Sequence, residues 1–486
     1  MDLIPIAIFW GLAIWAFFGR SRRLLYLFFA TVPFGSFAAI PTALTGGFTL
    51  TPTPLVAVLL VVRQFCSKDE LVQGLSLALR PSRMLLLLLF WLLAIVTTLA
   101  MPRLFRGQVT VVPVKGTEFM GVAQLQPTPQ NLSQALYVTI SVLAVLAFAR
   151  MLRTAPMRQH ALKALCLGAA ITVMTGMLDF ASLYLAPLAS MLEPFRTASY
   201  ALLTNVELED GKRLVGLMPE ASAFGGLALA FLVWLYFLRR AMPAGVLRER
   251  VVPVLLLLLL LLVWLSTSSA AYMSMAVFVC MAVAEWTWRA MQARGNALVR
   301  RGLSRELATG VGVLFVLLLL VVAFPNLLEP IRRQVDEFVL QKSASSSFEE
   351  RSMWTRVSWE ALMATNGLGV GLGGTRASNY AVALLSNAGV AAGVLYFSFV
   401  VQSLLLRRVP VYDLQGQALM HGIRWAYVVP FVTSLMIGTT PDFGIFNAFL
   451  YGFSAAIVST TFALHVGSKP QVPSPHPVVL RSAYDA

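Results

Sequence analysis

The sequence predicts an all-α polytopic membrane protein, and both its composition and its long uncharged segments support this fold class. The chain has 486 residues, of which 58% are hydrophobic and 12% are charged. Soluble domains average about 45–50% apolar and about 25% charged residues. Segments 84–100, 251–265 and 311–324 contain no charged residue, and a membrane-spanning helix needs roughly 20 apolar residues. We therefore expect a single transmembrane domain over residues 1–466.

The apolar segments divide into about 13 predicted spans. We expect them near residues 3–18, 24–44, 48–64, 84–101, 132–149, 162–179, 221–238, 251–266, 270–288, 307–324, 379–405, 425–440 and 443–465. Three connecting loops are long, namely 102–131, 180–220 and 325–378. The spacing in the last loop predicts an amphipathic surface helix over 327–339 and a second helix over 348–364.

The distribution of Lys and Arg predicts the orientation of the spans. About two thirds of the 37 Lys and Arg residues fall in one set of alternating loops, and the richer side should be cytoplasmic. The N-terminus would then lie outside, and the Pro-rich tail 467–486 would be disordered in the cytoplasm. The three long loops fall outside, where we expect any chemistry. This topology explains the net charge of +15 without nucleic acid as a partner.

The outer loops lack the residues that several kinds of site require. The chain contains no HExxH or CxxC motif, and its four histidines fall on the predicted cytoplasmic side or in the tail. We therefore expect no metal site and no cofactor. No GxSxG motif is present, which argues against a serine nucleophile. None of the cysteines, Cys66, Cys166 and Cys280, falls in a long outer loop, so no disulfide framework is indicated.

Arginine and carboxylate side chains are what the outer loops offer instead. The arginines are Arg196, Arg213, Arg351, Arg356 and Arg376. A guanidinium binds phosphate oxygens bidentately, and fixed cations stabilise a leaving pyrophosphate. The alternatives are a lipid-headgroup contact or an ion pair, such as Arg356 with Glu360 four residues on. Glu220, in GLMPEAS, is the best-placed carboxylate to accept a proton from an attacking hydroxyl.

Residues 367–374, with the sequence GLGVGLGG, contain five glycines. One reading is a tight turn that leads the chain back into the membrane. The other is a loop whose backbone amides approach an anionic ligand. No lysine follows as it would in a nucleotide-binding loop.

Three motifs, in order, resemble the O-antigen ligase and polysaccharide polymerase superfamily. The stretch RSMWTRVSWEALMATNGLGVGLGG, followed by a span with Gly389 and Gly393, is similar to that family's pattern of Arg, Trp and a GvGlG turn. The stretches FRTASYALLTN and DGKRLVGLMPEASAFG resemble the R-x-x-G-(x)-PE-S pattern of exopolysaccharide polymerases. WLSTSSAAY resembles their short S-x-S turn between two spans. The similarity covers about residues 195–400.

The resemblance implies a GT-C-like, metal-independent, inverting glycosyltransferase of the bacterial inner membrane. It would join undecaprenyl-pyrophosphate-linked oligosaccharide repeat units into an exopolysaccharide or similar surface glycan at the periplasmic face. The growing chain would be the donor, and the lipid pyrophosphate would be the leaving group. A flippase and a chain-length regulator of the same pathway are implied as partners.

The resemblance also implies roles for individual residues. Arg213 and Arg356 match phosphate-contacting arginines of the family, and Glu220 matches the motif acid of its polymerase branch. Supporting contacts to pyrophosphate or glycan are expected from Arg196, Arg351, Arg376, Ser378 and Tyr200.

Two departures from the family pattern favour polymerisation over transfer to lipid A-core. Ser378 precedes Asn379 where ligases commonly carry His, and Ser268 and Ser269 stand in a turn where ligases tend to carry Arg. An O-antigen-type ligase with the same donor is one alternative. A flippase is another, but it would line a central path with polar residues inside its spans, and this chain concentrates its ionisable residues in loops.

Overall fold

The computed structural model describes residues 3–45, 49–113, 121–199, 202–203, 207–208, 211–292, 297–323 and 346–467. In these ranges the chain is mostly helical, which confirms the predicted all-α class. The strands described are two short antiparallel hairpins. One pairs β1 (Thr110–Val111) with β2 (Ala123–Gln124), and the other pairs β3 (Glu207–Leu208) with β4 (Gly211–Lys212).

Several helices have the length and composition that a membrane requires. Among the described residues, five could cross one, namely α5 (Leu85–Leu104), α6 (Pro129–Met151), α7 (Ala155–Ala181), α9 with the turn after it (Ala221–Ala241) and α11 (Ser269–Met291). Shorter apolar helices include α1 (Leu3–Phe18), α3 (Pro52–Gln64) and Val390–Leu406, which begins with α16 (Val390–Val401). The chain is therefore a membrane protein, while the predicted number of spans is not confirmed.

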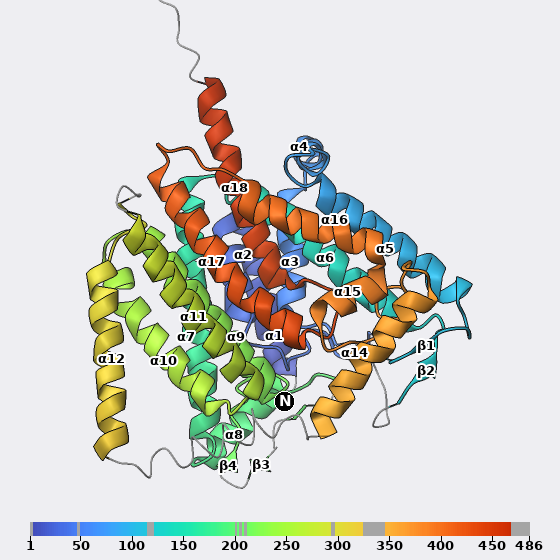
Figure 1. Cartoon of the computed structure of the whole chain (residues 1–486), viewed down its shortest axis with the longest axis horizontal. Helices are drawn as coiled ribbons and strands as arrows, with labels where there is room; N and C mark the ends of the chain where they lie inside the picture. The colour runs from blue at the N-terminus through green and yellow to red at the C-terminus, as the bar shows by residue number, and fades with distance from the viewer. Residues whose placement is uncertain are drawn as a thin grey trace, which may run out of the picture.

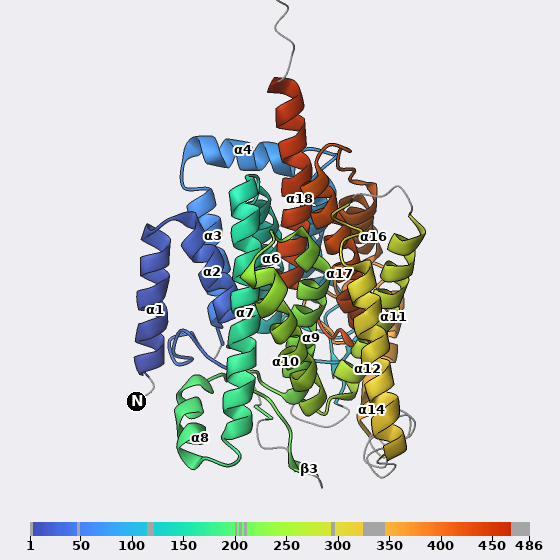
Figure 2. The same ribbon diagram turned by 90° about the vertical axis from the view of Figure 1, so that its left-hand side faces the viewer.

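The remaining helices complete the bundle and its loops (Figure 1). They are α2 (Ser21–Thr31), α4 (Lys68–Ala78), α8 (Ala186–Leu192), α10 (Val252–Leu265), α12 (Leu303–Ala323), α14 (Ser346–Ala364), α15 (Tyr380–Ala388), α17 (Leu414–Ile437) and α18 (Gly444–Gly467). Most of the long helices run roughly parallel, so the bundle has two ends (Figure 2). One end carries α8, β3 and the start of α1, and we call it the α8 end. The opposite end carries α4 and the end of α18, and we call it the α4 end.

The short helix α4 lies across the bundle rather than along it (Figure 2). It begins with a capping box, in which Ser67 and Glu70 each accept a hydrogen bond from the other's backbone amide. Leu71, Val72 and Leu75 are exposed on this helix. An amphipathic helix with such a surface is suited to the membrane interface.

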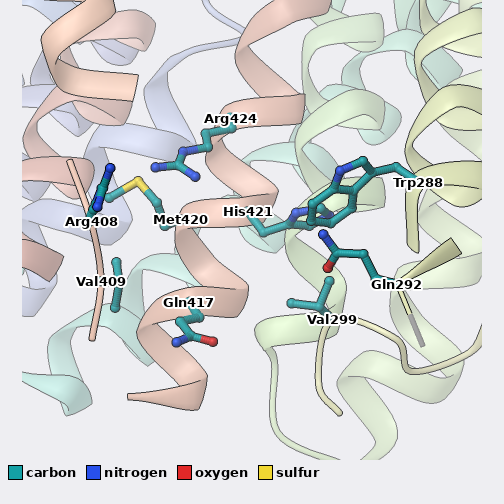
Figure 3. Close-up of a pocket in the computed structure, with 9 residues that line it drawn as sticks. All are labelled: Trp288, Gln292, Val299, Arg408, Val409, Gln417, Met420, His421 and Arg424. Carbon is teal, nitrogen blue, oxygen red and sulfur yellow. The ribbon is translucent and has the colours of Figure 1, made fainter. Parts of the chain in front are cut away.

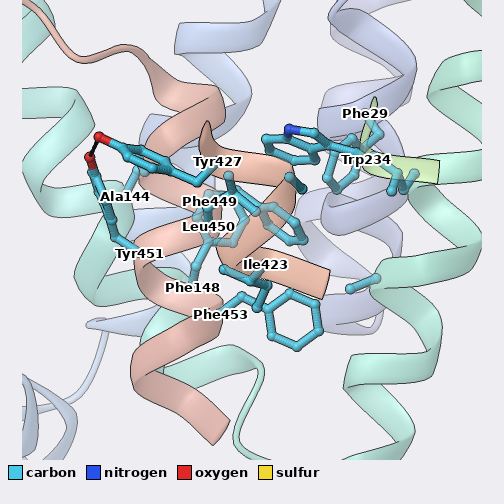
Figure 4. Packing of buried hydrophobic residues seen from close by; sticks show 14 of the residues in the cluster. Phe29, Ala144, Phe148, Trp234, Ile423, Tyr427, Phe449, Leu450, Tyr451 and Phe453 are labelled. Carbon is cyan, nitrogen blue, oxygen red and sulfur yellow. Dashed lines mark hydrogen bonds between the residues drawn. The ribbon is translucent and has the colours of Figure 1, made fainter. Parts of the chain in front are cut away.

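The core depends on aromatic side chains contributed by distant parts of the chain (Figure 4). Trp234 of α9 is buried and stacks on Phe449 of α18, with 5.6 Å between ring centroids. Phe29 and Phe148 pack edge-on against Phe449 at 5.0 and 5.3 Å. Edge-to-face pairs of this kind stabilise a core beyond their buried area. These contacts connect α2 and α6 with the last helix of the bundle.

Two predicted spans differ from the helices found. The span predicted over 24–44 is helical only to Thr31, because Pro33, Gly35 and Pro41 interrupt it. The span predicted over 379–405 is divided at Gly389, which has a φ of +87° between α15 and α16.

The long 325–378 loop is described only in part. Helix α14 confirms the helix predicted over 348–364. The amphipathic helix predicted over 327–339 lies outside the described residues, and so does all but the first residue of the predicted tail 467–486.

Candidate functional site

Asp179, at the end of α7, organises the loop that carries Arg213 and Glu220. Its Oδ2 accepts hydrogen bonds of 2.8 Å from the backbone amides of Val215 and Gly216. Its Oδ1 lies 2.8 Å from Nη2 of Arg196, and both side chains are almost inaccessible. Arg196 also donates to the carbonyl of Gly216 at 3.2 Å. This geometry favours a positioning role for Arg196 over direct contact with a ligand.

The segment after α2 is part of the same assembly. The Ser36 hydroxyl and amide both donate to the carbonyl of Leu217, each at 2.9 Å. The Ser36 carbonyl in turn accepts from the amides of Thr197 and Ala198 at 3.0 Å. Residues 32–38 therefore connect the loops before and after β3 and β4, and this explains why they are not helical.

Arg213 lies between its own loop and the short serine turn that joins α10 to α11. Its Nη2 donates to the carbonyl of Thr267 at 2.9 Å, and its Nε donates to the Thr267 hydroxyl at 3.3 Å. Thr267 has a φ of +44°, which is rare and strained for a β-branched residue. Arg213 thus stabilises an unfavourable backbone conformation, and three of its five N–H groups make no hydrogen bond to a residue that the structure describes.

The charge of Arg213 is influenced by burial and by its neighbours. Burial lowers the pKa of the half-buried Arg213 guanidinium, and the nearby Glu220 and Tyr272 oppose this effect. Arginine keeps its proton at neutral pH all the same. The guanidinium is therefore a fixed, partly desolvated cation beside a carboxylate.

Glu220 occupies the position immediately before the first turn of α9. Its Oε1 accepts a hydrogen bond from the Ser222 hydroxyl, and the side chain is half-buried. The negative charge of Glu220 acts on Arg213 and also on Arg376. The loop before α9 and the loop before α15 therefore lie close enough for their charges to act on one another.

Arg376 is held at this site by α14 and by the β1 hairpin. Its guanidinium carbon lies 3.4 Å from the centre of the Trp354 ring, a close cation–π contact. Its amide donates to the carbonyl of Val112 at 3.0 Å. Burial lowers the pKa of Arg376, opposed by Glu350 and Glu220, while the positive charge of Arg351 lowers it further. Helix α14 thus brings Glu350 and the half-buried Arg351 to the same group of charges.

The structure places three further candidate residues less directly at this site or leaves them undescribed. Arg356 is exposed on α14 and makes no hydrogen bond or ion pair with any described residue, so its possible pair with Glu360 is not found. Ser378 is half-buried, and its amide donates to the Thr355 hydroxyl at 3.1 Å. Tyr200 lies outside the described residues.

The glycine-rich loop, residues 367–374, forms hydrogen bonds with the backbone where α15 ends and α16 begins. The amides of Val370 and Gly371 donate to the carbonyls of Ser386 and Asn387 at 2.8 and 2.9 Å. The Gly367 carbonyl accepts from the amide at the start of α16 at 2.9 Å. Gly367, Gly369, Gly371 and Gly373 all have positive φ angles. Because these amides are occupied internally, the tight-turn reading is favoured over an anion-binding loop.

A cavity of about 310 Å³ lies next to these loops, between α9, α11 and α17. Gly226, Ala230 and Ser274 are among its lining residues, and most of the lining is apolar. Gly226 is six residues beyond Glu220, which corresponds to roughly 9 Å along a helix. The cavity therefore begins within two helical turns of the charged site.

Sequence reasoning missed three residues that build the site. Asp179 had a detectable signal, since it is a carboxylate at the end of an otherwise apolar segment. Nothing in the sequence indicates the positive φ of Thr267 or the stacking of Arg376 on Trp354. In the ranges described, no group of three or more His, Cys, Asp or Glu residues is placed to hold a metal ion.

Comparison of the chain with protein-family models and with curated proteins finds no match.

Proposed function

We propose that this protein is a GT-C-like, inverting, metal-independent glycosyltransferase of the bacterial inner membrane. It joins undecaprenyl-pyrophosphate-linked repeat units into an exopolysaccharide or similar surface glycan. In this proposal the chain crosses the membrane about 13 times, and the α8 end faces the periplasm. A flippase supplies the lipid-linked units, and a chain-length regulator acts on the product.

The observation that carries the proposal is the meeting of Arg213, Glu220 and Arg376 at the α8 end. Arg213 and Glu220 come from one sequence motif, Arg376 lies two residues after the end of a second, and Arg213 also contacts Thr267 in the third. Two partly buried guanidinium groups beside one carboxylate suit a reaction in which an anionic leaving group departs and a hydroxyl loses its proton.

The geometry suggests how each group acts. Arg213 and Arg376 bind the pyrophosphate of the donor, and their charges stabilise it as the bond from the anomeric carbon to the phosphate oxygen breaks. Glu220 accepts the proton of the acceptor hydroxyl as the new glycosidic bond forms on the opposite face of the sugar. Exposed on α14, Arg356 contacts the outer phosphate or the glycan chain.

The apolar cavity between α9, α11 and α17 supports a lipid-linked substrate. Its lining is mostly apolar, and its polar residues are the hydroxyls of Ser274, Thr433, Ser434 and Thr439, of which Thr433 donates to Ser274 at 2.8 Å. A polyprenyl chain needs such a surface close to the site that holds its pyrophosphate. The first isoprene units would occupy this cavity.

The test is reconstitution of the purified protein in lipid vesicles with a short-chain polyprenyl-pyrophosphate oligosaccharide and no other enzyme. Products are separated by gel and identified by mass spectrometry. A ladder spaced by one repeat unit, with release of free polyprenyl pyrophosphate, is the expected result. Movement of labelled substrate between leaflets without a ladder would instead identify a flippase. Transfer that occurs only after an acceptor such as lipid A-core is added would identify a ligase.

A further inference from the structure

A second pocket, which is polar, lies between α11 and α17 at the α4 end of the bundle (Figure 1). Figure 3 shows the residues that line it. It has a volume of about 320 Å³, at the lower end of the usual range for ligand sites. It is formed by the end of α11, the first turns of α17 and the segment that precedes α17. Its polar lining residues are Trp288, Gln292, Arg408, Gln417, His421 and Arg424.

The lining contains two arginines and one histidine but no Asp or Glu. Arg424 donates from Nε to the carbonyl of Leu404 at 2.5 Å and from Nη2 to the carbonyl of Arg407 at 2.7 Å. Within the described residues its Nη1 has no hydrogen-bond partner, and the exposed Arg408 makes no side-chain hydrogen bond or ion pair. The pocket therefore presents unused guanidinium donors without a compensating carboxylate.

The opposite wall of the pocket is fixed by a buried ionic cluster. The His421 ring stacks on Trp288 with 5.0 Å between centroids, and its Nε2 lies 2.7 Å from Oε1 of Glu285. Glu285 is fully buried and also pairs with Arg240 and Arg289 at 2.7 and 2.9 Å.

The same cluster adds to the positive charge around the pocket. The Glu306 carboxylate forms ion pairs with Arg239, Arg240 and Arg289. Three arginines thus surround two carboxylates, and the cluster is net positive before His421 is counted.

We propose that this pocket binds a phosphate group, with the phosphate oxygens between Arg408 and Arg424 and any neutral part of the ligand against Trp288. Two guanidinium groups match the planar geometry of phosphate oxygens, and Gln292 and Gln417 supply neutral hydrogen bonds. Basic pockets between membrane helices bind anionic lipid headgroups in other proteins. A headgroup or a free phosphate would supply the same chemistry, and the site is independent of the transferase proposal.

The experiment measures ligand binding to the purified full-length protein by native mass spectrometry and by its thermal unfolding midpoint. The probes are phosphatidylglycerol, phosphatidylcholine and inorganic phosphate. The principal variant is Arg408→Glu, because Arg408 is exposed and its side chain makes no hydrogen bond or ion pair with a described residue. Arg22→Glu is the matched control, since Arg22 is also exposed at the α4 end but lies outside the pocket. Arg424→Gln is a second variant whose folding is checked separately.

We expect phosphatidylglycerol to bind and to raise the unfolding midpoint, and Arg408→Glu to weaken this binding about tenfold. Arg22→Glu should bind as the unchanged protein does. Binding of inorganic phosphate alone, with the same loss in Arg408→Glu, would support the site and identify a soluble ligand. Binding of no probe, or equal losses in Arg408→Glu and Arg22→Glu, would overturn the proposal.

Discussion

At the scale of single residues, Arg213 joins two roles that mutation can separate. It stabilises the strained turn at Thr267, and in the proposed reaction it binds pyrophosphate. We expect Arg213→Ala to abolish polymer in membranes that still contain the inserted protein. Arg213→Lys should restore little, because an ammonium cannot make a bidentate contact. Polymer is measured by gel after expression of each variant.

The control for Arg213 removes its partner instead. Thr267→Val deletes the hydroxyl that accepts from Nε but keeps the guanidinium and the shape of the turn. We expect nearly normal polymer from this variant.

We also expect Arg356→Ala to abolish polymer. Normal polymer from both Arg213→Ala and Arg356→Ala would reject the phosphate-binding role.

Glu220 is expected to control turnover rather than binding. In Glu220→Gln the amide oxygen can still accept from the Ser222 hydroxyl, so the loop keeps its geometry while the base is lost. General-base catalysis contributes about 10²–10⁴-fold to a rate, and kcat should fall by a factor in that range with little change in KM. Steady-state rates with the purified protein test this, and an unchanged kcat would remove Glu220 as the base.

Arg196 should behave differently from Arg213, because its charge is already neutralised by Asp179 inside the protein. Removal of one partner from a buried ion pair destabilises a protein by about 3–5 kcal/mol. Arg196→Ala should therefore lower the thermal unfolding midpoint of the purified protein, and Arg196→Lys should recover part of it. If Arg196→Ala melted normally and yet made no polymer, a direct phosphate contact would be the better explanation.

At the scale of elements, the glycine loop and the broken helix form one hydrogen-bonded unit. A Cβ at Gly369 would lie 2.6 Å from the amide nitrogen of Gly389, and its φ is +84°. A non-glycine residue in this region costs about 1–2 kcal/mol, and the close contact adds to this. Gly369→Ala should thus lower the unfolding midpoint and polymer yield together. Gly11→Ala, at a position with open space inside α1, is the control and should not lower the midpoint, because alanine is the better helix former.

Hydrophobic runs made most membrane helices predictable, whereas the interruptions depended on tertiary contacts. Apolar composition is enough to locate α5, α7 and α9. The loop after α2 is stabilised by Ser36, whose partners lie more than 150 residues away in sequence. The break at Gly389 exists because the loop at Leu368 packs against it. Contacts of this range leave no local periodicity for sequence reasoning to detect.

For the candidate site, the sequence was enough to select residues but not to show which partners they would have. The motifs predict Arg213, Arg356 and Glu220, and the outer-loop position predicts Arg376 as a supporting residue. In the structure the charge of Glu220 acts on Arg213 and Arg376, whereas Arg356 makes no hydrogen bond or ion pair with a described residue. Residue type alone could not distinguish Arg196, which pairs with the buried Asp179, from Arg213, which has no carboxylate partner among the described residues. The distinction depends on the tertiary fold, which places the buried Asp179 carboxylate beside Arg196.

At the scale of the whole molecule, native cysteines can test the proposed orientation. Cys66 is exposed between α3 and α4, Cys166 is buried in α7, and Cys280 is exposed in the middle of α11. If the α4 end is cytoplasmic, a membrane-impermeant maleimide should label Cys66 in inverted vesicles and not in right-side-out vesicles. Cys66→Ser should abolish the signal, because lipid covers Cys280. Labelling in right-side-out vesicles would reverse the orientation.

The pairing of residues 367–371 with residues 386–390 also determines when the site can form during translation. The glycine-rich loop is synthesised before α15 and α16, whose backbone completes its hydrogen bonds. It cannot adopt its final conformation until residue 390 has left the ribosome and entered the membrane. The core contact between Trp234 and Phe449 forms still later, because Phe449 lies near the end of the chain. In the proposed function, a nascent chain would therefore be inactive through most of its synthesis, and only a nearly complete protein would act on its substrate.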